Sequence, residues 1–114
     1  MIDWIPLHSI EELDAVLESS KANPVMILKH STSCSISAMA KNRLERTWVQ
    51  AEVPKLKAYY LDLLKHRAVS NLIAETLNIA HQSPQILLIK DGICIHNSSH
   101  MAISFDDIKN NLSN

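Results

Sequence analysis

Glycine and cysteine are scarce in this sequence, and each shortage excludes a class of protein. One glycine, Gly92, stands among 114 residues, so long flexible connections are not expected. The two cysteines, Cys34 and Cys94, are too few for a disulfide framework of the secreted kind. They are far apart, so they form neither a Cys-x-x-Cys pair nor a zinc-type spacing. One disulfide between them is left open; two free thiols in a reducing compartment is the simpler interpretation.

Basic runs and long apolar stretches are also missing. The formal charge of −1 and the pI near 6.6 give no electrostatic reason to expect nucleic acid or acidic lipid as a partner. The N-terminal residues lack the basic and apolar segments of a signal peptide, and no apolar run approaches the roughly 20 residues that span a bilayer. We therefore expect a cytoplasmic protein with no membrane partner, folded as one domain over residues 1–114.

Hydrophobic periodicity predicts strands that alternate with helices. Capping boxes open two helices, at Ser9 with Glu12 and at Ser104 with Asp107, and Asp91-Gly92 is typical of a hairpin turn. Strands are expected over residues 3–7, 25–28, 57–64, 85–90 and 93–97, and helices over residues 10–22, 34–53, 68–78 and 104–112. This order predicts parallel pairs joined by right-handed crossovers, with a late antiparallel hairpin. The expected fold is α/β, with a mixed central sheet flanked by helices on both faces.

Cys34 lies where a buried strand should end and a helix should begin, in the stretch "HSTSCSIS". Open α/β sheets bind ligands at the carboxyl ends of their strands. A helix N-terminus carries unpaired N–H groups and a partial positive charge, which favour the thiolate over the thiol. Ser33, Ser35 and Ser37 are placed to cap the helix or to donate hydrogen bonds to the sulfur. The alternative is a small core residue, as most free cysteines are, and position alone leaves both interpretations open.

Ser83-Pro84 immediately precedes the strand predicted over residues 85–90. X-Pro bonds are the ones that readily adopt the cis form. A cis proline here would lie beside the start of the Cys34 helix and leave backbone groups exposed to an extended substrate. An ordinary trans proline at the start of a strand is the alternative.

Several blocks of the chain resemble one family. The order of elements, the cysteine at a helix start and the proline before a strand are similar to the thioredoxin fold. The blocks "ILKHSTSCSISAMAKNRLE", "YYLDLLKHRAVSNLIAE", "HQSPQILLIKDG" and "HNSSHMAIS" resemble the YtxJ-type monothiol bacilliredoxins. The family motif is usually Thr-Cys-Pro-Ile-Ser, whereas this chain has Ser33-Cys34-Ser35-Ile36-Ser37. Ser35 thus replaces a proline that suits the first turn of a helix.

The resemblance implies an enzyme that removes bacillithiol from protein mixed disulfides. Cys34 would attack the bacillithiol sulfur, release the client protein as a thiol and hold bacillithiol in a mixed disulfide. Ser33, Ser35, Ser37, Ser83 and Pro84 would support the site. The expected partners are S-thiolated client proteins and a low-molecular-weight thiol as co-substrate, with no tightly bound cofactor. Glutathione and coenzyme A are alternative thiols, and a non-catalytic adaptor that binds proteins beside Pro84 is the alternative function.

Residues in the motif and on the strand before it bear on the reaction cycle. Ser37 stands where a resolving cysteine would follow Cys34, so a second low-molecular-weight thiol or a reductase must complete the cycle. Thioredoxins proper carry a buried acid on the preceding strand, whereas this chain has Leu28 in that region, which disfavours a general dithiol reductase. Lys29 and His30 are candidates for raising the local positive potential, although strand alternation directs only one of them to any given face.

The six histidines form neither a His-Glu-x-x-His pattern nor a Cys/His cluster, so no metal site is expected. His81 is the one that we single out, because it lies just before Ser83-Pro84 and is a candidate to face Cys34. Cys94 lies on a predicted strand within "GICIH", where buried core filler is the expected role.

Overall fold

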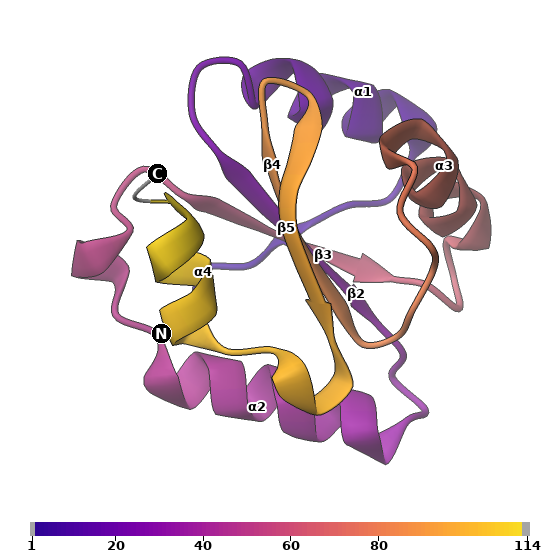
Figure 1. Ribbon diagram of the computed structural model, residues 1–114. Helices are drawn as coiled ribbons and strands as arrows, with labels where there is room; N and C mark the ends of the chain where they lie inside the picture. Colours follow the sequence, from indigo (N-terminus) through magenta and orange to yellow (C-terminus); the bar gives the residue numbers. More distant parts are fainter. Residues whose placement is uncertain (1, 113–114) are drawn as a thin grey trace.

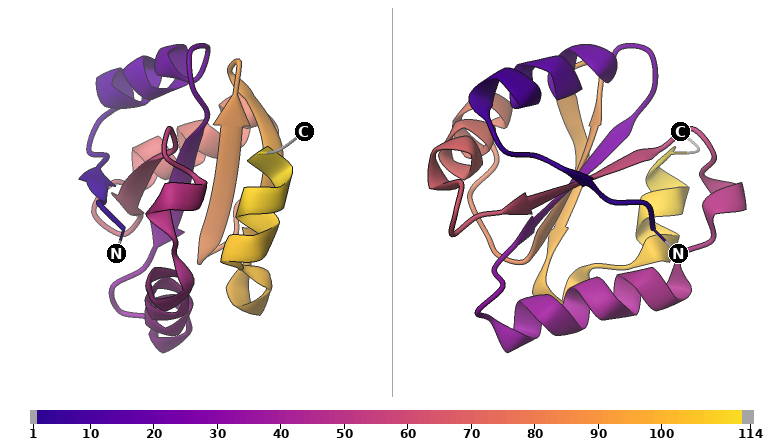
Figure 2. Two further views of the ribbon diagram at one scale, coloured as in Figure 1. Left: turned by 90° about the vertical axis from the view of Figure 1, so that its left-hand side faces the viewer. Right: turned by 180° about the vertical axis from the view of Figure 1, so that it is seen from behind.

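The computed structural model describes residues 2–112, which form one mixed sheet with helices on both faces (Figures 1 and 2). The strands have the spatial order β1-β3-β2-β4-β5. Their bounds are β1 Ile5–Pro6, β2 Val25–His30, β3 Lys57–Asp62, β4 Gln85–Lys90 and β5 Ile93–Ser99. The helices are α1 Ile10–Ser19, α2 Ser35–Thr47, α3 Arg67–Leu77 and α4 Phe105–Leu112, with two short 3-10 turns, η1 Gln50–Glu52 and η2 His100–Ala102.

The strand pairing confirms a mixed sheet with a late antiparallel hairpin, but the strand that follows α3 was expected to pair in parallel and does not. Strand β3 is parallel to both β1 and β2, whereas β4 is antiparallel to β2 and to β5. Asp91 and Gly92 form the two-residue turn between β4 and β5, with φ angles of 54° and 73°. Two consecutive positive φ angles match the right-handed twist of a hairpin, and glycine adopts them without the steric cost of a Cβ.

The sheet separates two hydrophobic clusters. Side chains of β2 and β4 that point one way pack against α2 and α4, and those that point the other way pack against α1 and α3. Within β2, Leu28 belongs to the first cluster and Ile27 to the second. The same alternation continues through Lys29 and His30, so these two buried residues lie on opposite faces of the sheet.

The helix expected over residues 34–53 ends earlier, at Thr47. Trp48 is extended, with φ −71° and ψ 129°, and its ring packs 5.0 Å from that of Phe105. Both Trp48 and Val53 are buried in the α2–α4 cluster. Five helical residues would turn these two side chains to different directions, since each residue advances by about 100°. The chain therefore leaves the helix to bury both.

The remaining differences from the predicted elements are confined to element ends. Strand β1 has two residues rather than five, β2 and β5 extend two residues further than expected, and β3 ends at Asp62. Both predicted caps are present, because Ser9 Oγ accepts the N–H of Glu12 and Ser104 Oγ accepts the N–H of Asp107, each at 3.1 Å. Within residues 2–112, the helices are too short or too polar to span a bilayer.

Candidate active site

Cys34 occupies the N-cap position of α2, one residue before the first helical residue. Its backbone is extended, with φ −109° and ψ 120°. Its N–H donates to Ser31 O at 3.2 Å, and its carbonyl oxygen accepts the N–H of Ala38 at 3.1 Å. The residue is partly exposed, and no side chain caps the N-terminus of α2 within the described part of the chain. The thiol thus lies at the positive end of a helix dipole, where first-turn amide groups are available to a bound anion.

The three serines of the motif differ in their exposure and in their hydrogen-bond partners. Ser33 and Ser35 are exposed, and Ser33 Oγ lies 3.3 Å from Ser31 Oγ. Ser37 is completely buried on the inner face of α2. Among residues 2–112, none of the three hydroxyl groups caps α2, which corrects the capping role that the sequence suggested. Ser37 is not available for capping, because its Oγ is bonded to the Ser31 N–H and to His30 Nδ1.

Ser37 instead ties the first turn of α2 to the end of β2. Its Oγ accepts the N–H of Ser31 at 3.1 Å and lies 2.6 Å from His30 Nδ1. The Ser31 amide can only donate, so the hydroxyl proton of Ser37 is free to point at His30 Nδ1. Burial lowers the pKa of His30, which favours the neutral imidazole that this bond requires. The contact between His30 and Ser37 therefore joins the two ends of the loop that contains Cys34. The centroid of the His30 ring also lies 5.3 Å from that of Tyr60.

The Ser83-Pro84 peptide bond is cis, which decides between the two alternatives that the sequence left open. Pro84 is buried, and its carbonyl oxygen accepts the N–H of His100 at 3.0 Å. Lys29 and Gln85 are register partners in β2 and β4, so Pro84 precedes β4 where β2 ends. In Figure 1 the connection from β2 to α2 and the connection from α3 to β4 lie together at the lower end of the sheet, and Figure 2 agrees. The structure thus brings the loop of residues 31–34, called the Cys34 loop below, and Ser83-Pro84 to the same end of the sheet.

His81 does not turn toward the sulfur. Its Nδ1 lies 3.3 Å from Lys29 Nζ and 3.3 Å from Ser70 Oγ, on the side of the sheet that α3 covers. The pKa of His81 is lowered, first by burial and second by the positive charge of Lys29. Lys29 is completely buried, and its burial lowers the pKa of its ammonium group to about 8. The sequence pattern raised Lys29 and His81 as separate candidates but did not show that they contact each other.

Cys94 lies on β5 close to the turn that joins β4 to β5, away from the end of the sheet that carries Cys34. It is a free thiol, as is Cys34, which answers the question of a disulfide between them. Its Sγ lies 3.4 Å from the carbonyl oxygen of His96, and it packs against the cluster between the sheet and α1 and α3. Cys94 is thus only partly buried and not the fully buried core residue that the sequence predicted. Burial raises the pKa of its thiol, which disfavours the thiolate.

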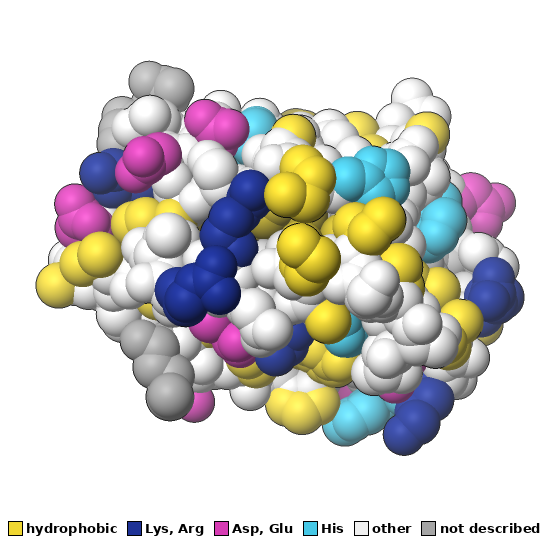
Figure 3. Space-filling model, turned by 90° about the horizontal axis from the view of Figure 1, so that it is seen from below, with side chains coloured by type: hydrophobic (Ala, Val, Ile, Leu, Met, Phe, Trp, Pro, Cys, Tyr) yellow, Lys and Arg dark blue, Asp and Glu magenta, His cyan; other side chains and the backbone are white. Residues whose placement is uncertain are grey.

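Apolar side chains border the site on its outer surface. Ile36 and Met39 on α2 are 49% and 59% exposed, and Met101 on η2 is 58% exposed. Arg43 holds η2 against α2 by donating to the carbonyl oxygen of Met101 at 2.7 Å. Figure 3 shows apolar side chains gathered on this face of the molecule. The three residues Ile36, Met39 and Met101 are called the apolar rim below.

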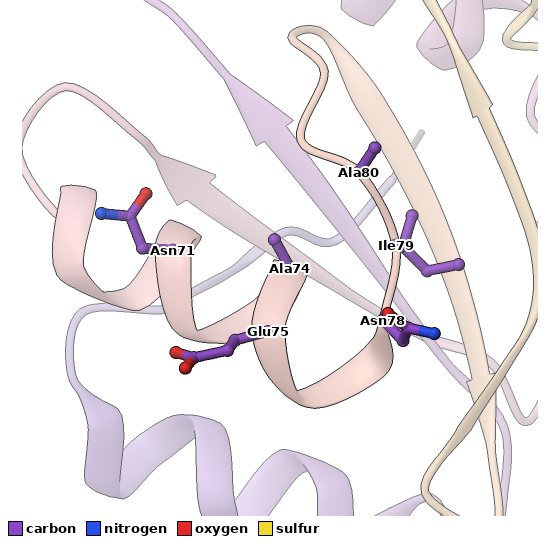
Figure 4. A pocket seen from close by; sticks show the side chains of 6 residues that line it. All are labelled: Asn71, Ala74, Glu75, Asn78, Ile79 and Ala80. Atoms are coloured by element: carbon purple, nitrogen blue, oxygen red, sulfur yellow. The ribbon is translucent and has the colours of Figure 1, made fainter.

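A separate hollow of about 610 Å³ lies along α3 and the segment that follows it, between Asn71 and Ala80. Figure 4 shows its lining side chains, which include Asn71, Glu75 and Asn78. None of the motif residues from Ser33 to Ser37 lines it, and neither does Pro84. The hollow is therefore distinct from the end of the sheet that carries Cys34.

Comparisons with known proteins identify the family. Residues 5–108 match the family described as monothiol bacilliredoxin BrxC. A solved structure described as having a thioredoxin fold is 31% identical, with a TM-score of 0.81 over 95% of this chain and 92% of that one. Thioredoxin from Malassezia sympodialis is 15% identical, with a TM-score of 0.73 over 95% of this chain and 86% of that one, which shows the fold alone. Thioredoxin from Trypanosoma brucei brucei is 13% identical, with the same TM-score of 0.73 over 97% of this chain and 88% of its own. The chain therefore belongs to the monothiol bacilliredoxin family, with the thioredoxin fold of a thiol–disulfide oxidoreductase.

Proposed function

We propose that this protein removes bacillithiol from S-thiolated client proteins, with Cys34 as its nucleophile. The observation that carries the proposal is the position of Cys34, a free and partly exposed thiol at the uncapped N-terminus of α2 in a member of this family. Cys94, the other cysteine, is also partly buried, but on β5 it packs against a hydrophobic cluster and burial raises the pKa of its thiol. The chain thus offers one thiol suited to attack.

The reaction is a thiol–disulfide exchange in two steps. The Cys34 thiolate attacks the bacillithiol sulfur of the mixed disulfide, a Cys34–bacillithiol bond forms, and the bond from bacillithiol to the client breaks. The client leaves as a thiolate and takes a proton from solvent. A second low-molecular-weight thiol or a reductase then attacks the Cys34–bacillithiol bond and returns Cys34 to its reduced form. Each step exchanges one disulfide for another, so no external oxidant is needed.

The residues around Cys34 support the first step and leave the second to an outside thiol. First-turn amide groups of α2 point toward the sulfur end of the helix and stabilise negative charge there. Ser37, which replaces a resolving cysteine, is buried and bonded to His30 and Ser31. Because a hydroxyl cannot attack a disulfide under these conditions, the adduct on Cys34 persists until another thiol arrives.

The apolar rim favours a protein as the client. Ile36, Met39 and Met101 present adjustable apolar surface beside the nucleophile, and methionine adapts to varied partners. A small charged disulfide would gain little from such a surface, whereas a folded protein would bury it. Two free thiols also fit a reducing compartment, which supports a cytoplasmic location.

The test uses a client protein carrying bacillithiol on one cysteine, with release followed by mass spectrometry. We expect the wild type to release the client thiol and to gain the mass of bacillithiol on Cys34. Cys34→Ser should release none, whereas the matched control Cys94→Ser should act at close to the wild-type rate. Release by Cys34→Ser at the wild-type rate would contradict the proposal.

A second measurement identifies the thiol. The reduced protein is offered an equimolar mixture of oxidised bacillithiol, glutathione and coenzyme A, and the adduct on Cys34 is weighed. A predominant bacillithiol adduct supports the proposed substrate, and a predominant glutathione or coenzyme A adduct replaces it. Absence of any adduct, with client binding retained, would support the non-catalytic adaptor instead.

A further inference from the structure

Two buried polar side chains lie next to each other at the end of the sheet where β2 ends and β4 begins, close to the site. Lys29 in β2 and Gln85 in β4 are register partners, and they are 0% and 1% exposed. Both lie on the face of the sheet covered by α1 and α3, opposite to the face on which α2 packs. Burying such groups is unfavourable unless they form hydrogen bonds, so their partners indicate their role.

Their partners lie mostly in the segment that leads to Pro84. Lys29 Nζ lies 3.3 Å from Nδ1 of His81, and it donates to the carbonyl oxygen of Ser70 in α3 at 3.1 Å. Gln85 Nε2 donates to the carbonyl oxygen of Ala80 at 3.1 Å, and Gln85 Oε1 accepts the N–H of Gln82 at 3.4 Å. Ala80 and Gln82 are thus each hydrogen-bonded to Gln85 in β4, and His81 contacts Lys29 in β2.

We propose that Lys29 and Gln85 are positioning residues that hold the segment 80–84 against the Cys34 loop, with Lys29 acting through His81. The inference rests on the proposed function, since it assigns to this segment the placement of the mixed disulfide beside Cys34. Neither residue touches the reacting sulfur atoms. They act by fixing the position of the segment 80–84 at the end of the sheet where β2 ends and α2 begins.

The chemistry of the contact explains why an ammonium group suits this position. Lys29 has three donors, and Ser70 O and His81 Nδ1 are two acceptors on different elements. His81 accepts at Nδ1 only as a neutral ring with its proton on Nε2. The nearby positive charges of Lys29 and Arg67, after burial, disfavour protonation of that ring. An apolar side chain of similar length would pack at this position without the cost of burying a charge. The role of Lys29 is therefore geometric and not one of filling the core.

The test compares two readouts in Lys29→Met and His81→Leu. The first readout is alkylation of Cys34 by iodoacetamide, a small reagent that does not need the segment 80–84. The second is kcat/KM for client release from the bacillithiol mixed disulfide. We expect alkylation within twofold of the wild type and a fall in kcat/KM of tenfold or more, with Lys29→Met melting at a higher temperature. If Lys29 had only a structural role, its replacement would not give a protein that is more stable and yet slower in client release.

Matched controls separate this effect from general damage. His81→Gln keeps an oxygen acceptor for Lys29, and we expect it to restore most of the release rate. Ile27→Val, on the same face of β2, should lower the melting temperature and leave the ratio of the two readouts unchanged. Release at the wild-type rate in both Lys29→Met and His81→Leu would overturn the inference, and so would equal slowing of alkylation and release.

Hydrogen exchange keeps the inference testable if the proposed function fails. Lys29→Met, His81→Leu and Gln85→Leu should each speed amide exchange over residues 80–86, and Ile27→Val should not. Unchanged exchange in all three variants would refute the positioning role whatever Cys34 does. Faster exchange together with release by Cys34→Ser would refute the proposed function and leave the positioning contacts supported.

Discussion

The N-terminus of α2 differs from those of α1 and α4 in the way its amide groups are treated. Ser9 caps α1 and Ser104 caps α4, and the first turns of these helices contain acidic residues. Helix α2 begins with Cys34, has no acidic residue in its first turn and has no side-chain cap. The N-termini of α1 and α4 are thus capped by local side chains, whereas those of α2 and α3 have no such cap within residues 2–112, and at α2 the N-cap residue is a cysteine. The N-terminal amide groups of a helix can therefore be satisfied by a local cap, which adds stability, or be left available to an anion such as a thiolate.

The largest effect is expected where the uncapped helix is tied to the sheet. Ser37→Ala removes a buried hydroxyl and leaves the Ser31 N–H and His30 Nδ1 without their partner. We expect a loss of about 2 kcal/mol in the free energy of unfolding, measured in urea. Ala40→Gly, which also weakens α2 but leaves this tie intact, serves as a control for helix propensity. A loss below that of Ala40→Gly would show that the tie contributes little.

Giving α2 an acidic first turn like those of α1 and α4 should reduce reactivity. Ser35→Asp places a carboxylate beside the helix end, where it competes with the Cys34 thiolate for the same positive potential. We expect iodoacetamide alkylation at pH 7 to slow by about tenfold, which corresponds to about 1.4 kcal/mol. Ser35→Asn has a similar shape without the charge and should alkylate at close to the wild-type rate. Equal slowing in both variants would mean that shape, not charge, matters.

Exchanging the two kinds of N-cap residue should move stability in opposite directions. Ser9→Ala removes the cap of α1 and should cost about 1 kcal/mol, with no change in Cys34 alkylation. Cys34→Ser supplies α2 with a side chain that caps well, so the inactive variant should be more stable by up to about 1 kcal/mol. Thermal unfolding of both variants checks the pair. A Cys34→Ser protein less stable than the wild type would contradict the view that the uncapped end is unfavourable for folding.

The smallest expected effect is a pH dependence of stability below neutrality. Burial lowers the pKa of His30 in the folded state, so the unfolded chain binds the proton more readily. Stability should therefore be full above the ordinary histidine pKa of about 6.5 and should fall as the pH drops from there toward the lowered value. His81 adds in the same direction, since its pKa is also lowered. His30→Gln and His81→Gln should each flatten the slope of urea stability between pH 5 and 7; an unchanged slope in both would exclude this origin.

Much of the fold followed from local patterns. The capping boxes at Ser9 and Ser104 and the Asp91-Gly92 turn were predicted and are present. The placement of Cys34 at the start of α2 followed from the change of periodicity after β2. Such features depend on residues within one or two turns of each other, so the sequence carries the whole signal. The end of α2 was missed because it depends on Phe105, which is distant in sequence from Trp48.

The position of the candidate nucleophile, Cys34, was predictable from the sequence, and the contacts of the residues around it were less so. Ser37 was expected to help Cys34 directly, and Lys29 and His81 were considered one at a time. The structure shows Ser37 bonded to His30 and Lys29 in contact with His81. Alternation along β2 correctly separated Lys29 from His30, but it could not say which helix or loop each would meet. That depends on how α3 and the segment 80–84 dock on the sheet.

By itself, the sequence determined the order of helices and strands, the turn between β4 and β5 and the position of a single thiol at a helix start. These features depend on backbone preferences and on hydrogen bonds between near neighbours along the chain. Tertiary structure alone decided which polar groups are buried and which partners satisfy them, as Lys29 and Gln85 illustrate. A buried polar group needs a partner with correct geometry, and that partner comes from whichever distant segment packs over it.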